Sequence, residues 1–164
     1  MGVPVGDVEI RDLSADGPIV ERLIGWQIAH YRKAFPSFDR DDWLDFYAPL
    51  MRRHHGSLPV LLGAFVEGEC TGTVAIVERD DLDDVDGYTP WIAAMIVDPE
   101  RRGSGTGTAL LEAAVARCRD MRFELVYLWT HDMQDWYAQL GWEKVEERSF
   151  RNVSITIFKL DPIL

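Results

Sequence analysis

The feature that most constrains this chain is a glycine-rich segment, "DPERRGSGTG" at residues 98–107, which directly follows the apolar run "WIAAMIV" at 91–97. The apolar run predicts a strand, and the apolar spacing after the glycines predicts a helix over roughly 107–122. Glycines let the backbone approach a ligand closely, and a helix that begins there directs free N–H groups and its positive dipole end at an anion. The segment therefore predicts a strand–turn–helix unit that binds a pyrophosphate; a turn without any ligand is the alternative.

Three familiar phosphate-binding motifs do not fit this segment. A Walker A loop requires a lysine after its last glycine, whereas Gly107 is followed by Thr108. The dinucleotide motif GxGxxG requires a glycine at position 108. Both that fold and a methyltransferase-type fold also need several further strands, for which the rest of the chain is too short. What remains is an Arg-x-x-Gly-x-Gly pattern that runs from Arg102 to Gly107.

The rest of the chain predicts one mixed α/β domain that spans residues 1–164. The run "LVYLWT" at 125–130 is apolar throughout, which is typical of a strand buried on both faces. The segment "RRHHG" at 52–56 predicts the end of a helix. The predicted elements are a strand at 8–13, helices that begin at Asp16 and Asp39, a hairpin over 58–79, the strand at 91–97, the helix near 107–122, the strand at 125–130, a short helix near 133–140 and a final hairpin.

Composition narrows the class of partner. Lys and Arg number 17 and Asp and Glu 28, for a net charge of −11, which disfavours nucleic acid and suits a cationic small molecule or peptide. No apolar run approaches the roughly 18 residues that a membrane span requires. Cys70 and Cys118 form no CxxC pair, and the four histidines have no zinc spacing. We therefore expect a cytoplasmic protein with no metal and no membrane segment.

Two segments in this order resemble the GCN5-related N-acetyltransferases (GNAT). "MIVDPERRGSGTGTALLEAAVARCR" at 95–119 is similar to that family's acetyl-CoA-binding segment, including its apolar-Val-x-Pro-x-x-Arg start. "LVYLWT" and "WYAQLGW" (136–142) resemble the later segment, where an aromatic-Tyr-x-x-x-Gly-aromatic pattern closes the cofactor cleft. The resemblance covers roughly residues 58–160, whereas 14–56 match only as two helices. It implies a central mixed sheet that splays between two parallel strands and is flanked by helices.

The resemblance implies acetyl-CoA as a co-substrate and assigns residues to it. The backbone of Met95, Ile96 and Val97 is expected to pair with the pantetheine arm, because an extended polyamide can add to a free strand edge. The residues expected to hold the pyrophosphate are Arg102, Gly103, Ser104, Gly105, Thr106, Gly107 and Thr108.

The same resemblance implies a catalytic tyrosine. Tyr137 matches the family residue that protonates the leaving thiolate, and a phenol of pKa about 10 can donate to a thiolate of pKa about 8.5. A backbone N–H of the 91–97 strand is expected to stabilise the oxyanion. The expected activity is transfer of acetyl from acetyl-CoA to a primary amine by direct attack. The alternatives are a protein N-terminal acetyltransferase and a non-catalytic acyl-CoA sensor, which would have no need to keep Tyr137.

The acceptor side is less defined by the sequence. A lysine-like amine lies about 3.4 pKa units from its neutral form at pH 7, so a general base helps. Histone-type family members carry a glutamate near the start of the cofactor strand, where this chain has Trp91. The remaining candidates are Glu78, Asp80 and His131. The segment 78–87 holds six acidic residues and one arginine, which either attract a cationic amine or form a solvated loop. The exposed final hairpin is compatible with a homodimer.

Overall fold

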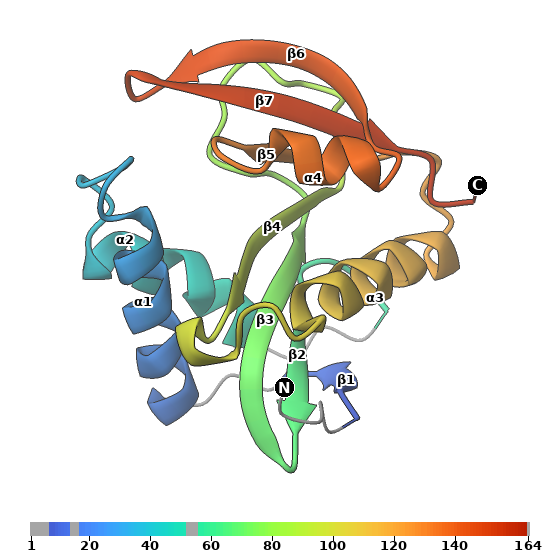
Figure 1. Cartoon of the computed structure of the whole chain (residues 1–164). Helices are drawn as coiled ribbons and strands as arrows, with labels where there is room; N and C mark the ends of the chain where they lie inside the picture. The colour runs from blue at the N-terminus through green and yellow to red at the C-terminus, as the bar shows by residue number, and fades with distance from the viewer. Residues whose placement is uncertain (1–6, 14–16, 52–55, 164) are drawn as a thin grey trace.

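The computed structural model of the chain describes residues 7–13, 17–51 and 56–163. Its strands form one seven-stranded mixed sheet in the order β1-β2-β3-β4-β5-β7-β6 (Figure 1). The elements in chain order are β1 (Glu9–Asp12), α1 (Gly17–Tyr31), α2 (Arg40–Tyr47), η1 (Ala48–Met51), β2 (Val60–Val66), β3 (Glu69–Val77), β4 (Trp91–Val97), η2 (Pro99–Arg101), α3 (Thr106–Asp120), β5 (Val126–Thr130), α4 (Gln134–Gln139), β6 (Glu143–Phe150) and β7 (Val153–Leu160). This order and the mixed sheet confirm the predicted fold class. The predicted helix start at Asp16 and most of the predicted stop at 52–56 lie outside the described residues.

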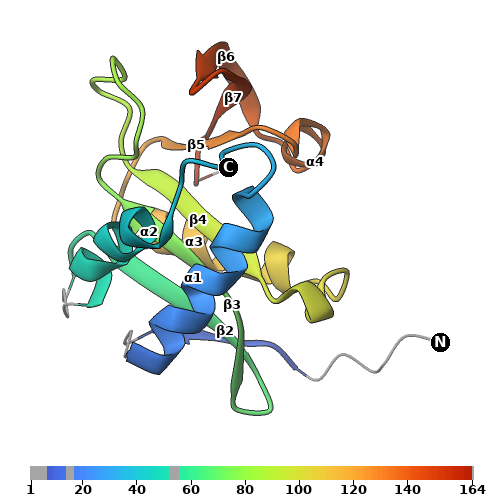
Figure 2. The same ribbon diagram turned by 90° about the vertical axis from the view of Figure 1, so that its left-hand side faces the viewer.

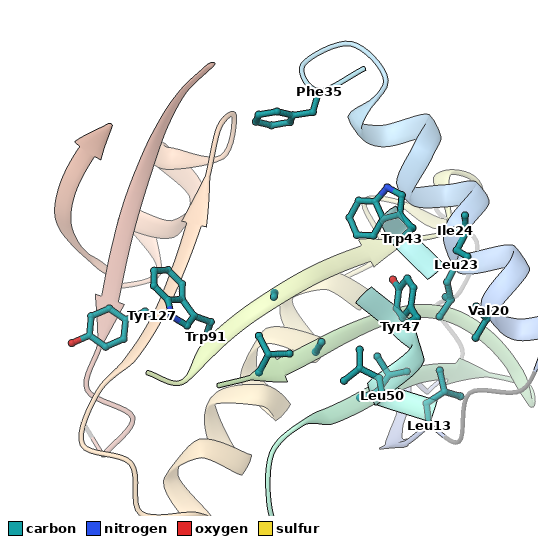
Figure 3. Packing of buried hydrophobic residues seen from close by; sticks show 14 of the residues in the cluster. Leu13, Val20, Leu23, Ile24, Phe35, Trp43, Tyr47, Leu50, Trp91 and Tyr127 are labelled. Carbon is teal, nitrogen blue, oxygen red and sulfur yellow. The ribbon is translucent and has the colours of Figure 1, made fainter. Parts of the chain in front are cut away.

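The sheet separates at its middle. β4 and β5 are parallel neighbours, and among the described residues they pair at one position, Trp91 with Tyr127. The two rings lie side by side there, with centroids 5.7 Å apart (Figure 3). Along its other edge, β5 pairs over its whole length with β7. One edge of β4 is therefore left without a strand partner beyond its first residues.

Helices cover the two faces of the sheet differently. α1 and α2 lie over one face and α3 over the other (Figure 1, Figure 2). On the first face, Leu23 of α1 and Tyr47 of α2 are fully buried against the strands (Figure 3). On the second face, α3 buries an apolar stripe that consists of Leu110, Leu111, Ala114 and Cys118. Cys70 and Cys118 are both buried free thiols.

The starts of α2 and α3 each depend on an identifiable residue. Asp39 caps α2 as predicted: its carboxylate accepts the Asp42 N–H, and the Asp42 carboxylate accepts the Asp39 N–H, both at 3.0 Å. The start of α3 depends on Gly72 of β3, because a Cβ there would lie 2.8 Å from the Ile96 carbonyl oxygen and 3.1 Å from Leu110 Cδ1. The absence of a side chain at Gly72 therefore allows α3 to begin directly against β3 and β4. Within the described ranges, no helix is both long and apolar enough to cross a membrane.

Candidate functional site

A cavity of about 630 Å³ opens where β4 and β5 separate. Its lining divides into two regions that we name by their residues. The glycine end consists of the turn residues Arg101, Arg102, Gly103, Gly105, Thr106, Gly107 and Thr108. The aromatic end consists of Tyr31, Phe38, Trp43, Phe46 and Trp129, together with Asp42, Asp80 and Asp81. β4 and Tyr137 also line the cavity.

The turn at the glycine end has a backbone that requires glycine at two positions. Gly103 has φ +79° and Gly105 has φ +85°, and a Cβ at either would meet nothing within 4 Å. The requirement therefore comes from the left-handed conformation and not from crowding. Gly105 is the N-cap of α3 and supplies no side-chain cap. The first N–H groups of α3 are thus free to bind an anion in the cavity.

Side chains of the turn have different partners. The Ser104 hydroxyl donates to the Arg101 carbonyl at 2.6 Å and lies 3.1 Å from Thr106 Oγ1, so it serves the turn itself. Ser104 does not line the cavity, and its role in binding stays a prediction. Arg101 is held by Glu69 at 3.2 Å, whereas Arg102 is exposed at the cavity. Of the two arginines, Arg102 has the freer guanidinium.

β4 carries a bulge in the middle of the cavity wall. The register between β3 and β4 shifts between Thr73 and Ala75, and Ala94 has φ +52°. Gln27 of α1 donates its side-chain amide to the Ala94 carbonyl at 3.0 Å and to the Tyr47 hydroxyl at 3.0 Å. Because the C=O and N–H of a trans peptide point in opposite directions, the Met95 N–H points away from Gln27. This bulge supplies a backbone donor that is not used by a regular ladder.

Met95, Ile96 and Val97, which the sequence assigns to the pantetheine arm, follow the bulge and line the cavity. They lie beyond Trp91, the residue at which β4 pairs with β5 among the described residues. An extended ligand can therefore use this strand edge.

Tyr137 is placed by α4, directly after β5. It is buried and packs against Trp136 at 4.9 Å and Phe158 at 6.0 Å between ring centroids. Burial raises the pKa of its phenol well above the usual range, and Asp132 adds to the effect. The hydroxyl therefore stays protonated at neutral pH, and its role as a proton donor stays a prediction.

Asp80 is the best-placed carboxylate of the predicted acceptor candidates. It lines the cavity, and its oxygens accept from Trp129 Nε1 at 2.9 Å and from the Asp81 N–H at 2.8 Å. Burial raises the pKa of Asp80 to about 6. At neutral pH the carboxylate is therefore largely ionised and yet able to take a proton.

The other candidates are distributed unevenly. His131 lines the cavity, and its ring lies 5.7 Å from Tyr31 and 5.4 Å from Phe35. Glu78 is exposed on the loop after β3 and does not line the cavity. Trp91 is 1% exposed, donates to the Tyr88 carbonyl at 2.6 Å and lies in the core beneath the cavity lining. The structure thus brings Asp80 and His131 to the cavity, and not Glu78 or Trp91.

The sequence predicts Asp80 as a candidate but does not predict that the rings of the aromatic end line a site. Trp43 and Phe46 belong to a helical apolar stripe, which normally indicates core packing. The only signal in the sequence is the density of aromatic residues between 31 and 47. As for metal, the described part of the chain contains no group of three or more His, Cys, Asp or Glu side chains arranged to hold an ion.

Comparisons with known proteins agree on one family. The family model described as "Acetyltransferase (GNAT) family" matches residues 20–142. A GNAT-family acetyltransferase from Staphylococcus aureus Mu50 superposes with a TM-score of 0.72 at 18% identity, over 95% of this chain and 99% of that one. An aminoglycoside 6'-N-acetyltransferase complexed with coenzyme A gives 0.73 at 13% identity, over 95% and 98%. A GNAT-family acetyltransferase from Elizabethkingia anophelis with acetyl-CoA bound gives 0.64 at 15%, over 94% and 97%. No curated protein matches the sequence significantly.

Proposed function

The chain belongs to the acetyltransferase (GNAT) family, and we propose that it transfers an acetyl group from acetyl-CoA to the nitrogen of a primary amine. One observation carries this proposal: a single cavity is lined by the glycine turn, the unpaired edge of β4, Tyr137 and Asp80. The first two features suit the donor, and the last two supply the acid and the base that the reaction needs.

The glycine end suits the donor's pyrophosphate. The free N–H groups at the start of α3 are directed at an anion, and Arg102 adds a positive charge beside them. Acetyl-CoA, as a substrate, brings the reactive thioester. We expect those backbone groups of Met95, Ile96 and Val97 that face away from β3 to pair with its polyamide arm.

In the proposed reaction, residues of the cavity accept or donate each proton that is transferred. The acceptor enters as an ammonium ion and gives one proton to Asp80, which passes it to solvent. The neutral nitrogen attacks the thioester carbonyl, a C–N bond forms and the C–S bond breaks. The Met95 N–H of the bulge stabilises the oxyanion. Tyr137 protonates the departing sulfur, and the second proton lost from nitrogen restores the phenol.

Two assays test this proposal together. Acetyl-CoA at about 100 times its Kd should stabilise the folded chain by about 2.7 kcal/mol, which for this size raises Tm by roughly 5 °C or more. ATP, NAD and S-adenosylmethionine serve as controls and should give no rise. Thiol release with a panel of primary amines then measures transfer. No response to acetyl-CoA would contradict the donor site. A response without thiol release for any amine would favour a non-catalytic acyl-CoA sensor.

A further inference from the structure

Five aromatic rings line one end of the cavity. Tyr31 stacks on Trp43 with centroids 5.6 Å apart, and Phe38 and Phe46 meet Trp43 at 5.9 Å and 6.0 Å. These rings come from α1, from the α1–α2 connection and from α2, and Trp129 of β5 also lines the cavity. Tyr31, Phe38, Phe46 and Trp129 are each only partly buried, so part of their surface faces the cavity. We call these five residues the aromatic wall.

Four carboxylates line the cavity, and three of them, Asp42, Asp81 and Asp132, are exposed. Asp132 lies 3.6 Å from His131 Nε2. The Asp42 carboxylate accepts the Asp39 N–H in the cap of α2. Burial raises the pKa of Asp81, and the nearby guanidinium of Arg151 opposes that rise. Arg151 itself lies over the Phe38 ring at 4.2 Å and is not among the lining residues.

Asp80 differs from these because it is partly buried, and its hydrogen-bond partners are the neutral N–H groups of Trp129 and Asp81. The lysine and arginine side chains that line the cavity, Arg101 and Arg102, belong to the glycine end. Among the described residues that line the cavity, Asp80 is therefore the carboxylate least exposed to solvent, and no lysine or arginine of the lining lies at its end.

Such a site favours a ligand that combines an ammonium group with an apolar group. An ammonium ion is attracted both to a carboxylate and to the faces of aromatic rings, most strongly where water is excluded. An apolar body gains from contact with the wall. Hydroxyl groups on the ligand weaken binding, because rings cannot replace the hydrogen bonds that these groups make with water.

We propose that the acceptor is a primary amine carried on a short chain by an aromatic or branched alkyl group, with its ammonium at Asp80 and its body against the aromatic wall. This inference rests on the proposed function and adds the substrate class. It separates this chain from the aminoglycoside acetyltransferases whose fold it shares, because a polyhydroxylated polycation would leave many hydroxyls unpaired at the wall.

The experiment compares amine acceptors that differ in charge or in the size and polarity of the group that carries the amine. Thiol release from acetyl-CoA is measured with phenethylamine, ethylamine, spermidine and tobramycin, and binding of the same amines is followed by tryptophan fluorescence. We expect kcat/KM for phenethylamine to exceed that for each of the other three by about 10-fold or more, since one buried aromatic body is worth that factor. A preference for spermidine or tobramycin would overturn the substrate class and leave the acetyltransferase intact. Binding of phenethylamine without thiol release would support the site and contradict the proposed reaction.

Variants of the aromatic wall test whether its rings cause the preference for phenethylamine over ethylamine. Phe46→Ala should lower the ratio of kcat/KM for phenethylamine over ethylamine by about 5- to 10-fold, because only the larger amine contacts the ring. Phe123→Ala removes a half-buried ring that packs against the α3 side of the sheet and should leave the ratio unchanged. Phe46→Leu, which keeps an apolar side chain, preserves the test if Phe46→Ala does not fold. An unchanged ratio in both Phe46 variants would overturn the proposal.

Discussion

The two ends of the cavity are built in opposite ways. The glycine end is a continuous stretch of chain whose ligand-binding groups are mainly backbone N–H groups, presented by the left-handed turn at Gly103 and Gly105. The aromatic end is assembled from side chains of α1, α2, β5, the α1–α2 connection and the loop after β3. The glycine end is therefore fixed by local conformation, and the aromatic end is fixed by tertiary packing. Substitution at one end should therefore leave the other working.

The largest effect is expected from Gly105→Asp. The new side chain strains a residue at φ +85° and brings a negative charge to the start of α3, where the pyrophosphate is expected. Affinity for acetyl-CoA, measured by calorimetry, should fall by about 100-fold or more. Amine binding at the aromatic end, followed by tryptophan fluorescence, should be retained.

The matched control for this variant is Gly68→Asp in the β2–β3 turn. Gly68 has φ +80° and open space around it, so the backbone strain is the same, but it does not line the cavity. Equal loss of acetyl-CoA binding in both variants would show that strain, not the site, is responsible.

The next largest effect is expected at Tyr137, the proposed proton donor to the leaving thiolate. Tyr137→Phe should lower kcat by about 100-fold or more, because general acid catalysis contributes at least that factor, and should leave the Kd for acetyl-CoA within about 3-fold. Stopped-flow thiol release separates the two quantities. Tyr127→Phe in β5, whose ring stacks on Tyr88 at 4.7 Å away from the cavity, is the control. Equal kcat values for wild type and Tyr137→Phe would remove the acid role.

A pH profile tests the aromatic end alone. The pKa of Asp80 is raised to about 6 by burial, and the base must be ionised to accept a proton. The ratio of kcat/KM between wild type and Asp80→Asn should therefore rise with pH up to about 6 and level off near pH 7, at about 10- to 30-fold. Taking the ratio cancels the ionisation of the amine itself. Asp83→Asn, in the same loop and outside the cavity lining, should give a ratio near one at every pH.

The smallest effect is on stability. The folded-state pKa of Asp80, about 6, lies above its unfolded value, so the folded protein binds more protons between these two pKa values. Stability is therefore lost as pH rises from about 4 to about 6, by roughly 1–2 kcal/mol for a partly buried group. Asp80→Asn should lack this loss and be the more stable protein at pH 7. Urea denaturation at pH 4 and pH 7 measures the difference, and an equal pH response in both proteins would contradict it.

The sequence predicts the glycine end better than the aromatic end for a physical reason. The apolar run at 91–97 is bounded by Pro90 and Asp98, and it coincides with β4 as a strand. The glycine turn and the Asp39 cap are equally local, so short patterns reveal them. Trp43 and Phe46 show only helical apolar spacing. A side chain that packs in a core and one that faces a cavity follow the same spacing, and only the assembled fold separates them.

The bulge of β4 escaped prediction because its cause lies far away in the chain. Ala94 is an ordinary residue for a strand, and nothing near it in the sequence signals a positive φ. The conformation is held by Gln27, a buried amide of α1. A contact between residues so distant in the chain appears only when the helix has packed on the sheet.

Gln27 has a further consequence for how recognition and chemistry are joined. It lies one helical turn before Tyr31. The same helix therefore contributes a ring to the aromatic wall and binds the Ala94 carbonyl, which orients the Met95 N–H. In the proposed reaction, α1 therefore connects the residue that contacts the acceptor, Tyr31, to the residue that holds the Ala94 carbonyl, Gln27. Under that proposal, an acceptor that displaces Tyr31 would also move Gln27 and the Met95 N–H, and a poorly fitting amine is expected to lower the rate as well as the affinity.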